Sequence, residues 1–150
     1  MNQVRGVTPA RARALWAEGA HPNVGVLQKL WEAVAEQDRE AFDDVTDPEI
    51  LVTIGGASCL SGAYAGRAQV WHLVEKVLAL SHHAFFAEPL DIAASASRAM
   101  VLVRAGAARQ QLWYTSEFVL ECGLADERVH TIRLYVKDPT AFELFWNQVA

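Results

Sequence analysis

The sequence predicts an α+β fold, in which a curved, cone-shaped antiparallel sheet packs against N-terminal helices and leaves an internal cavity between the layers. Three observations predict it. Apolar residues follow a helical period in much of the first 80 residues. Strand-like segments at short spacings then fill residues 83–137. The chain has 150 residues, 52% of them hydrophobic, which predicts one domain with a sizeable core.

The N-terminal half supplies most of the predicted helices. The clearest covers 22–37, where Pro22 suits the first position and one apolar stripe recurs at i, i+3, i+4 and i+7. Asp38 caps a short second helix, which Asp47-Pro48 ends. The stripe of the first helix consists of Leu27, Leu30, Trp31 and Val34.

Residues 1–21 are predicted to be an N-terminal extension, and residues 22–150 a single domain. Thr8-Pro9 resembles an N-cap followed by proline at the first helical position, so a short helix is expected over 10–17.

The remaining elements alternate before the strands take over. A β-branched segment at 49–54 predicts a strand, and a loop with Gly62 and Gly66 follows, holding Tyr64. A third helix is expected at 67–80. Strands are expected at 83–93, 98–106, 109–121 and 128–137, and an amphipathic helix at 140–149 closes the chain.

Charge and cysteine content exclude several classes of function. The formal net charge is −5, so no basic surface for nucleic acid or for an anionic membrane is expected. Cys59 and Cys122 lack CxxC spacing, and we interpret them as reduced thiols of a cytoplasmic protein. His82-His83 has no third ligand at a recognisable spacing, so neither a metal nor another cofactor is expected.

Several local motifs resemble the SnoaL-like proteins of the nuclear transport factor 2-like superfamily, whose fold is cystatin-like. The resemblance covers about residues 23–147 and is carried by the turn Gly62-Ala63-Tyr64-Ala65-Gly66-Arg67 before a helix and by the closing Phe145-Trp146. It implies a relative of polyketide cyclases, ketosteroid isomerases, limonene-type epoxide hydrolases or pocket proteins without known chemistry.

The catalytic positions that this resemblance implies are mostly occupied by apolar residues. The isomerase base falls at Ile54, or at Thr53 in a shifted register, and its two phenol positions fall at Leu30 and Val74. The cyclase aspartate falls near Leu134, and the epoxide hydrolase Arg-x-Asp pair has no counterpart around Arg104. Steroid isomerisation by the known mechanism is therefore predicted to be absent.

Strand alternation predicts which side chains face the cavity. On 112–121 the set containing Tyr114, Ser116 and Phe118 is mainly apolar and is expected to face the helices, as is the set containing His130 on the next strand. The expected ligand-binding wall comprises Trp31, Phe42, Ile54, Tyr64, Leu73, Phe86, Phe118, Ile132, Leu134 and Trp146.

The opposite sheet face is expected to be an interface. If the two last strands pair across a loop at 122–127, Glu117 lies opposite Arg133, with Trp113 and Tyr135 beside them. Because family members commonly dimerise through this face, the resemblance implies a homodimer.

Two functions remain open. In the first, a small enzyme binds an apolar, natural-product-like molecule and promotes its cyclisation, isomerisation or epoxide opening. Tyr114 is then the donor to a developing oxyanion, Ser116 lies beside it, and Glu117, in a register shifted by one, or Asp91 is the supporting carboxylate. In the second, a non-catalytic dimeric pocket protein binds a hydrophobic small molecule. A titratable group beside Tyr114 in a closed cavity favours the enzyme, whereas a purely apolar lining favours the binding protein.

Overall fold

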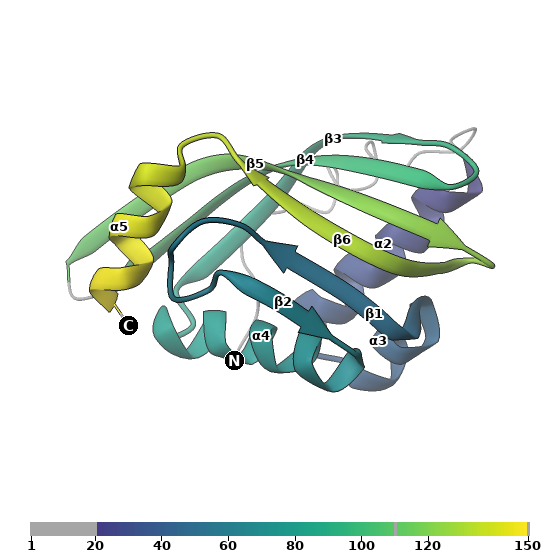
Figure 1. Cartoon of the computed structure of the whole chain (residues 1–150), viewed down its shortest axis with the longest axis horizontal. Coiled ribbons are helices and arrows are strands. Elements are labelled where there is room, and N and C mark those ends of the chain that lie inside the picture. The colour runs from purple at the N-terminus through teal and green to yellow at the C-terminus, as the bar shows by residue number, and fades with distance from the viewer. Residues whose placement is uncertain (1–20, 110, 150) are drawn as a thin grey trace.

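The computed structural model describes residues 21–109 and 111–149, so the short helix expected at 10–17 lies outside the described residues. The described part of the chain combines helices and strands in the predicted α+β manner (Figure 1). The elements in chain order are α2 (Pro22–Glu36), α3 (Arg39–Val45), β1 (Thr46–Ile54), β2 (Gly62–Ala65), α4 (Arg67–Leu80), β3 (Phe85–Ala94), β4 (Arg98–Arg109), β5 (Leu112–Ala125), β6 (Arg128–Val136) and α5 (Pro139–Val149).

The strands form one open six-stranded sheet in the order β2-β1-β6-β5-β4-β3. The α+β class is confirmed. The prediction of an antiparallel sheet is wrong for one pair of strands, because β1 and β6 pair in parallel. The chain leaves β1, passes through β2, α4 and the antiparallel strands β3, β4 and β5, and returns beside β1 in the same direction. Such long crossovers are what parallel neighbours require.

The segment predicted as a loop around Tyr64 is instead the edge strand β2. It pairs antiparallel with β1, with Tyr64 opposite Val52. The strand has only four residues, Gly62–Ala65. So short a segment carries too little alternation to reveal itself in the sequence.

The helices α2 and α3 begin where their sequence signals predict, and α2 ends at Glu36, one residue earlier than expected. The ring nitrogen of His21 accepts a hydrogen bond from the backbone of Asn23, Pro22 occupies the first turn, and Gln37 adopts a left-handed conformation at the C-cap. The Asp38 carboxylate accepts the backbone N–H of Ala41 at 3.1 Å and so caps α3.

The β5–β6 hairpin is tighter than predicted. Its loop consists of Asp126 and Glu127, both with positive φ, as two-residue hairpin turns with the favoured twist require. The predicted pairing of Glu117 with Arg133 is therefore wrong. Arg133 lies opposite Glu121, four residues along β5, whereas Glu117 lies opposite Arg104 of β4.

A register shift near the start of β6 reverses two predicted orientations. Gly123 pairs with Thr131 but Leu124 pairs with Val129, so His130 is the extra residue of the bulge. Val129 is fully buried, although simple alternation predicts it on the outer face. His130, expected in the cavity, lies outside, with Nδ1 at 3.5 Å from a carboxylate oxygen of Asp47.

The helices α2, α3 and α4 lie on one side of the sheet, and α5 packs near one end of it (Figure 1). Arg67 at the start of α4 fixes this arrangement, because its guanidinium donates to the Asp43 carbonyl at 2.7 Å and to the Thr46 hydroxyl at 3.2 Å. Within the described residues, no helix is long and apolar enough to cross a membrane.

Candidate functional site

A cavity of about 260 Å³ lies between the sheet and the helices α2, α4 and α5. Among the residues that the structure describes, none on the lining is charged, and none is a histidine, an amide, a serine or a threonine. On the described wall, polar side-chain atoms belong only to Trp31, Trp146 and Cys122. The lining comprises Leu27, Leu30, Trp31, Val34, Ala35, Phe42, Val52, Ile54, Leu60, Val70, Leu73, Val74, Val77, Phe85, Ala87, Val101, Phe118, Leu120, Cys122, Ile132, Leu134, Phe142 and Trp146.

Two sequence periodicities build this wall. The predicted stripe of α2 lines it in full, with Leu27, Leu30, Trp31 and Val34. On the sheet side, Phe118, Leu120 and Cys122 are alternate residues of β5, and Ile132 and Leu134 are alternate residues of β6. The strand face predicted to meet the helices is therefore the face that does so.

Most residues of the expected wall lie on the cavity. These are Trp31, Phe42, Ile54, Leu73, Phe118, Ile132, Leu134 and Trp146. Four positions at which the family resemblance implies polar catalytic groups, namely Leu30, Ile54, Val74 and Leu134, also line it. At these four positions this chain has aliphatic side chains instead of polar ones.

Tyr64 and Phe86 do not line the cavity. The Tyr64 hydroxyl donates to the Leu60 carbonyl at 2.6 Å, and burial, reinforced by Cys59, raises the pKa of this phenol. Phe86 lies on the other face of β3, where its ring covers Gly106 so closely that a Cβ there would come within 2.2 Å of it. Phe85 lines the cavity instead, and two adjacent phenylalanines give no alternation by which to choose between them.

Tyr114 lies behind the cavity wall rather than on it. Its ring stacks on Phe145, with centroids 5.2 Å apart, and meets Phe142 edge-on at 6.2 Å. Its hydroxyl is buried and has no hydrogen-bond partner among the described residues. Burial raises the pKa of this phenol, the Ser116 hydroxyl opposes the rise, and Asp138 reinforces it. Tyr114 is therefore a neutral donor at ordinary pH.

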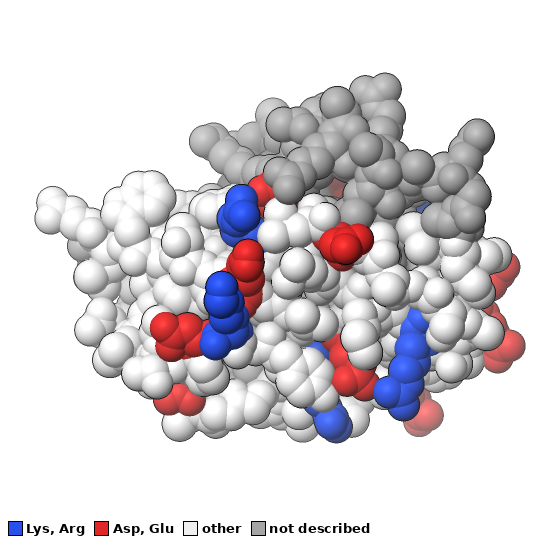
Figure 2. Space-filling view, turned by 90° about the horizontal axis from the view of Figure 1, so that it is seen from above, with Lys and Arg blue, Asp and Glu red and all other residues white. Residues whose placement is uncertain are grey.

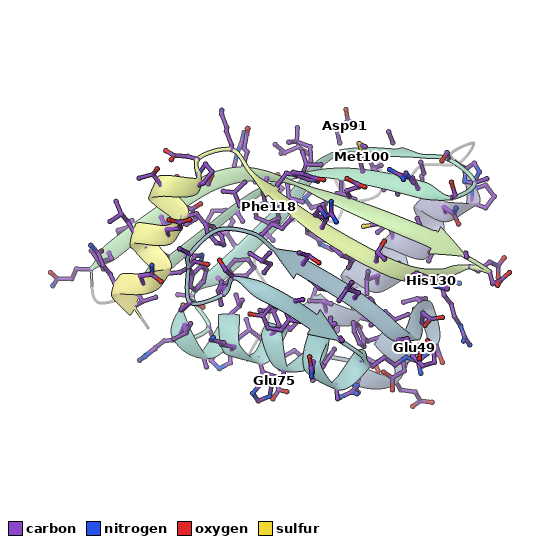
Figure 3. The ribbon with its side chains drawn as sticks, viewed as in Figure 1. Glu49, Glu75, Asp91, Met100, Phe118 and His130 are labelled. Carbon is purple, nitrogen blue, oxygen red and sulfur yellow. The ribbon has the colours of Figure 1, made fainter. Side chains whose placement is uncertain are left out.

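The other candidate catalytic residues do not line the cavity either. The Ser116 hydroxyl is 3.3 Å from the Glu117 carbonyl oxygen, to which it donates. The Glu117 carboxylate lies on the outer face, 4.0 Å from the ammonium group of Lys137. Figure 3 shows Asp91 on the upper, outer side of the sheet, together with Met100, and Glu75 on the far side of α4. No carboxylate among the described residues lines the cavity.

Cys122 carries the only ionisable side chain on the described part of the cavity wall. Burial, with a smaller effect from Glu121, raises the pKa of its thiol to about 12, so the thiol is neutral and poorly nucleophilic. Within residues 21–109 and 111–149, no three His, Cys, Asp or Glu side chains are grouped so that they could hold a metal ion.

A second hollow, of about 660 Å³, lies between α2, α3 and the β5–β6 turn. Its wall is mixed and combines apolar side chains, the cations Lys29 and Arg128, and the carboxylates of Glu32, Glu36, Asp44, Asp126 and Glu127. None of the candidate catalytic or ligand-binding residues lies on it.

The outer face of the sheet carries a row of exposed apolar side chains. Trp113 is 78% exposed and Tyr135 48%, and Leu51, Met100 and Leu102 are exposed as well. Figure 2 shows the upper side of the molecule, where charged groups of both signs lie scattered among a mainly uncharged surface. The residues expected in a dimer interface, Trp113, Glu117, Arg133 and Tyr135, share this face.

Comparison with solved structures places the fold among nuclear transport factor 2-like proteins. Bal32a, from a soil-derived mobile gene cassette, matches with a TM-score of 0.78 at 18% identity over 83% of this chain and 95% of that chain. A nuclear transport factor 2-like protein from Burkholderia xenovorans LB400 matches with a TM-score of 0.73 at 20% identity, over 87% and 100%.

A further match is described as a SnoaL-like polyketide cyclase from Jannaschia sp. CCS1, with a TM-score of 0.70 at 15% identity over 87% of this chain and 95% of that chain. No protein-family model and no curated protein sequence matches the chain. The predicted nuclear transport factor 2-like fold, which one neighbour's description names cystatin-like, is confirmed. A fold of this kind hosts many functions, so the function must be argued from the cavity.

Proposed function

We propose that this protein binds a largely apolar small molecule in the cavity between the sheet and the helices. The observation that supports this most is the lining itself, which encloses room for a ligand and carries no charged side chain among the described residues. An engineered cavity of about 150 Å³ takes up benzene. A cavity of about 260 Å³ therefore suits a molecule of about two fused rings.

A matched pair of variants on β5 tests this proposal. Leu120 lines the cavity, whereas its neighbour Val119 points to the opposite face. In Leu120→Trp the larger side chain is expected to fill the cavity and to remove most of the binding of naphthalene, measured by equilibrium dialysis. Val119→Trp is expected to bind naphthalene as the wild type does. Absence of binding in the wild type, or equal binding in both variants, contradicts the proposal.

A second candidate function is a cyclisation, an isomerisation or an epoxide opening promoted in the same cavity. The observation in its favour is the buried hydroxyl of Tyr114, a neutral donor behind the wall that has no hydrogen-bond partner among the described residues. Neighbours of the same fold that are described as polyketide cyclases make the class reasonable. Because no base among the described residues lines the cavity, such a reaction would depend on substrate folding and on one donor.

Native mass spectrometry of freshly purified protein separates the two functions. A co-purifying molecule that is released as two chromatographically distinct isomers of one mass, with a ratio that Tyr114→Phe changes, supports the enzyme. A single compound that Tyr114→Phe leaves unchanged supports a protein that binds without turnover.

A further inference from the structure

We propose that the indole N–H of Trp146 is the polar anchor of the cavity, and that the ligand presents a hydrogen-bond acceptor to it. The inference rests on the proposed binding function and narrows the ligand to one class. That class is a mainly apolar molecule of about two rings that carries a carbonyl, ether or hydroxyl oxygen.

The first step of the argument is an unsatisfied donor. Trp146 lines the cavity and is only 2% exposed, and its Nε1 has no hydrogen-bond partner among the described residues. Buried N–H groups in folded proteins nearly always have a partner, so one that lacks it beside a cavity points to a group that the described residues do not supply. Because the indole nitrogen only donates, the missing partner must be an acceptor.

The second step is the rigidity of the donor. The indole ring meets Phe145 edge-on at 5.1 Å and Phe142 at 6.3 Å, which limits its rotation. The backbone behind it is tied to the loop before β2, because the Cys59 thiol donates to the Trp146 carbonyl at 3.3 Å. Asn147 strengthens this tie by accepting the Cys59 N–H at 2.8 Å. A donor held in this way needs little ordering when a ligand arrives.

The third step is that the rest of the described wall offers few hydrogen-bond donors. Besides Trp146, only Trp31 and Cys122 of the described residues bring polar side-chain atoms to the lining. The Cys122 thiol is neutral and a weak donor. Trp31 is partly exposed, and its nitrogen is not among the buried atoms left without a partner. An oxygen that enters the cavity is therefore expected to meet Trp146.

Two probes of the same shape test the anchor. 2-Acetylnaphthalene and 2-isopropenylnaphthalene have the same number of heavy atoms and differ by a carbonyl oxygen in place of a methylene group. We expect the wild type to bind both and to prefer the ketone by roughly three- to tenfold, relative to the partition of each probe between water and an apolar solvent. In Trp146→Phe this preference is expected to vanish while the hydrocarbon still binds. Trp31→Phe, the matched control, is expected to retain the preference.

The outcomes separate this inference from the function beneath it. If neither probe binds to the wild type, the proposed binding function fails and the anchor fails with it. If both probes bind but the wild type shows no preference, or if Trp146→Phe keeps the preference, the anchor is refuted while the binding function stands.

A second measurement needs no substitution, and so it decides the matter even if Trp146→Phe does not fold. In proton–nitrogen correlation spectra of the wild type, the assigned indole N–H proton of Trp146 is expected to move downfield with the ketone and to stay in place with the hydrocarbon. Equal shifts with the two probes would refute the anchor.

Discussion

Replacing Ile54 with aspartate tests whether the cavity excludes water. Ile54 is 8% exposed, lines the cavity, and occupies the position at which the family resemblance implies a catalytic carboxylate. No lysine, arginine or histidine of the described residues lines the cavity to compensate a negative charge there. A carboxylate at this place would lose its hydration without gaining a partner, and its pKa would rise.

The size of the effect follows from that rise. Burial raises carboxyl pKa values by up to about 3–5 units, and each unit is worth about 1.4 kcal/mol. With a rise of about three units, the introduced carboxyl would have a pKa near 7 in the folded protein and about 4 in the unfolded chain. Because the folded state then holds its proton more tightly, stability is lost as the pH rises from about 4 towards 7. The loss reaches about 4 kcal/mol at and above neutral pH.

The assay compares Ile54→Asp with Ile54→Asn by urea unfolding at several pH values. Both variants lose the isoleucine side chain, at about 2–5 kcal/mol, but only aspartate titrates. We expect the two to be equally stable near pH 4, to diverge by about 1.4 kcal/mol per pH unit up to about pH 7, and to keep a constant difference above it. A difference that stays constant with pH would show that the carboxylate is hydrated. It would thereby refute the water-poor cavity on which the proposed function depends.

Two further predictions concern the outer face and the thiols. We expect a homodimer through the outer sheet face in sedimentation velocity, and Trp113→Asp is expected to give a monomer because it places a charge at the most exposed apolar side chain of that face. A monomeric wild type would contradict this. Cys59 is partly exposed and Cys122 is buried with a pKa of about 12, so one thiol is expected to react quickly with Ellman's reagent and the other only after unfolding. Two equally fast thiols in the native protein would show that the cavity opens readily.

Much of the cavity wall could be predicted because regular elements repeat one pattern over many residues. The stripe of α2 and the alternating face of β5 each place several side chains at once, so Leu30, Phe118 and Leu134 are predicted to face inward and do so. Such patterns fail where a single residue changes the phase. Because of the bulge at His130, the Val129 side chain points into the core rather than outward.

Other features depend on contacts between distant parts of the chain. The Asp126-Glu127 turn contains neither asparagine nor glycine, the usual signals of a two-residue hairpin, so the register of β5 and β6 could not be predicted. Tyr114 occupies the predicted face of β5, yet α5 covers it with Phe142 and Phe145. Alternation predicts the side of a sheet to which a side chain points, but not which helix covers it.

The cavity is itself an argument for a ligand. Vacant volume in a core destabilises a protein by about 24 cal/mol per Å³, so about 260 Å³ corresponds to at most about 6 kcal/mol. This is comparable to the whole stability of a typical domain, about 5–15 kcal/mol. Larger apolar side chains at lining positions such as Ala35, Ala87 and Val74 could fill the space, and no charged side chain of the described lining would oppose them. Under the proposed function, a bound apolar molecule would restore the missing contacts and stabilise the folded state by mass action, which would account for a wall that is both apolar and open.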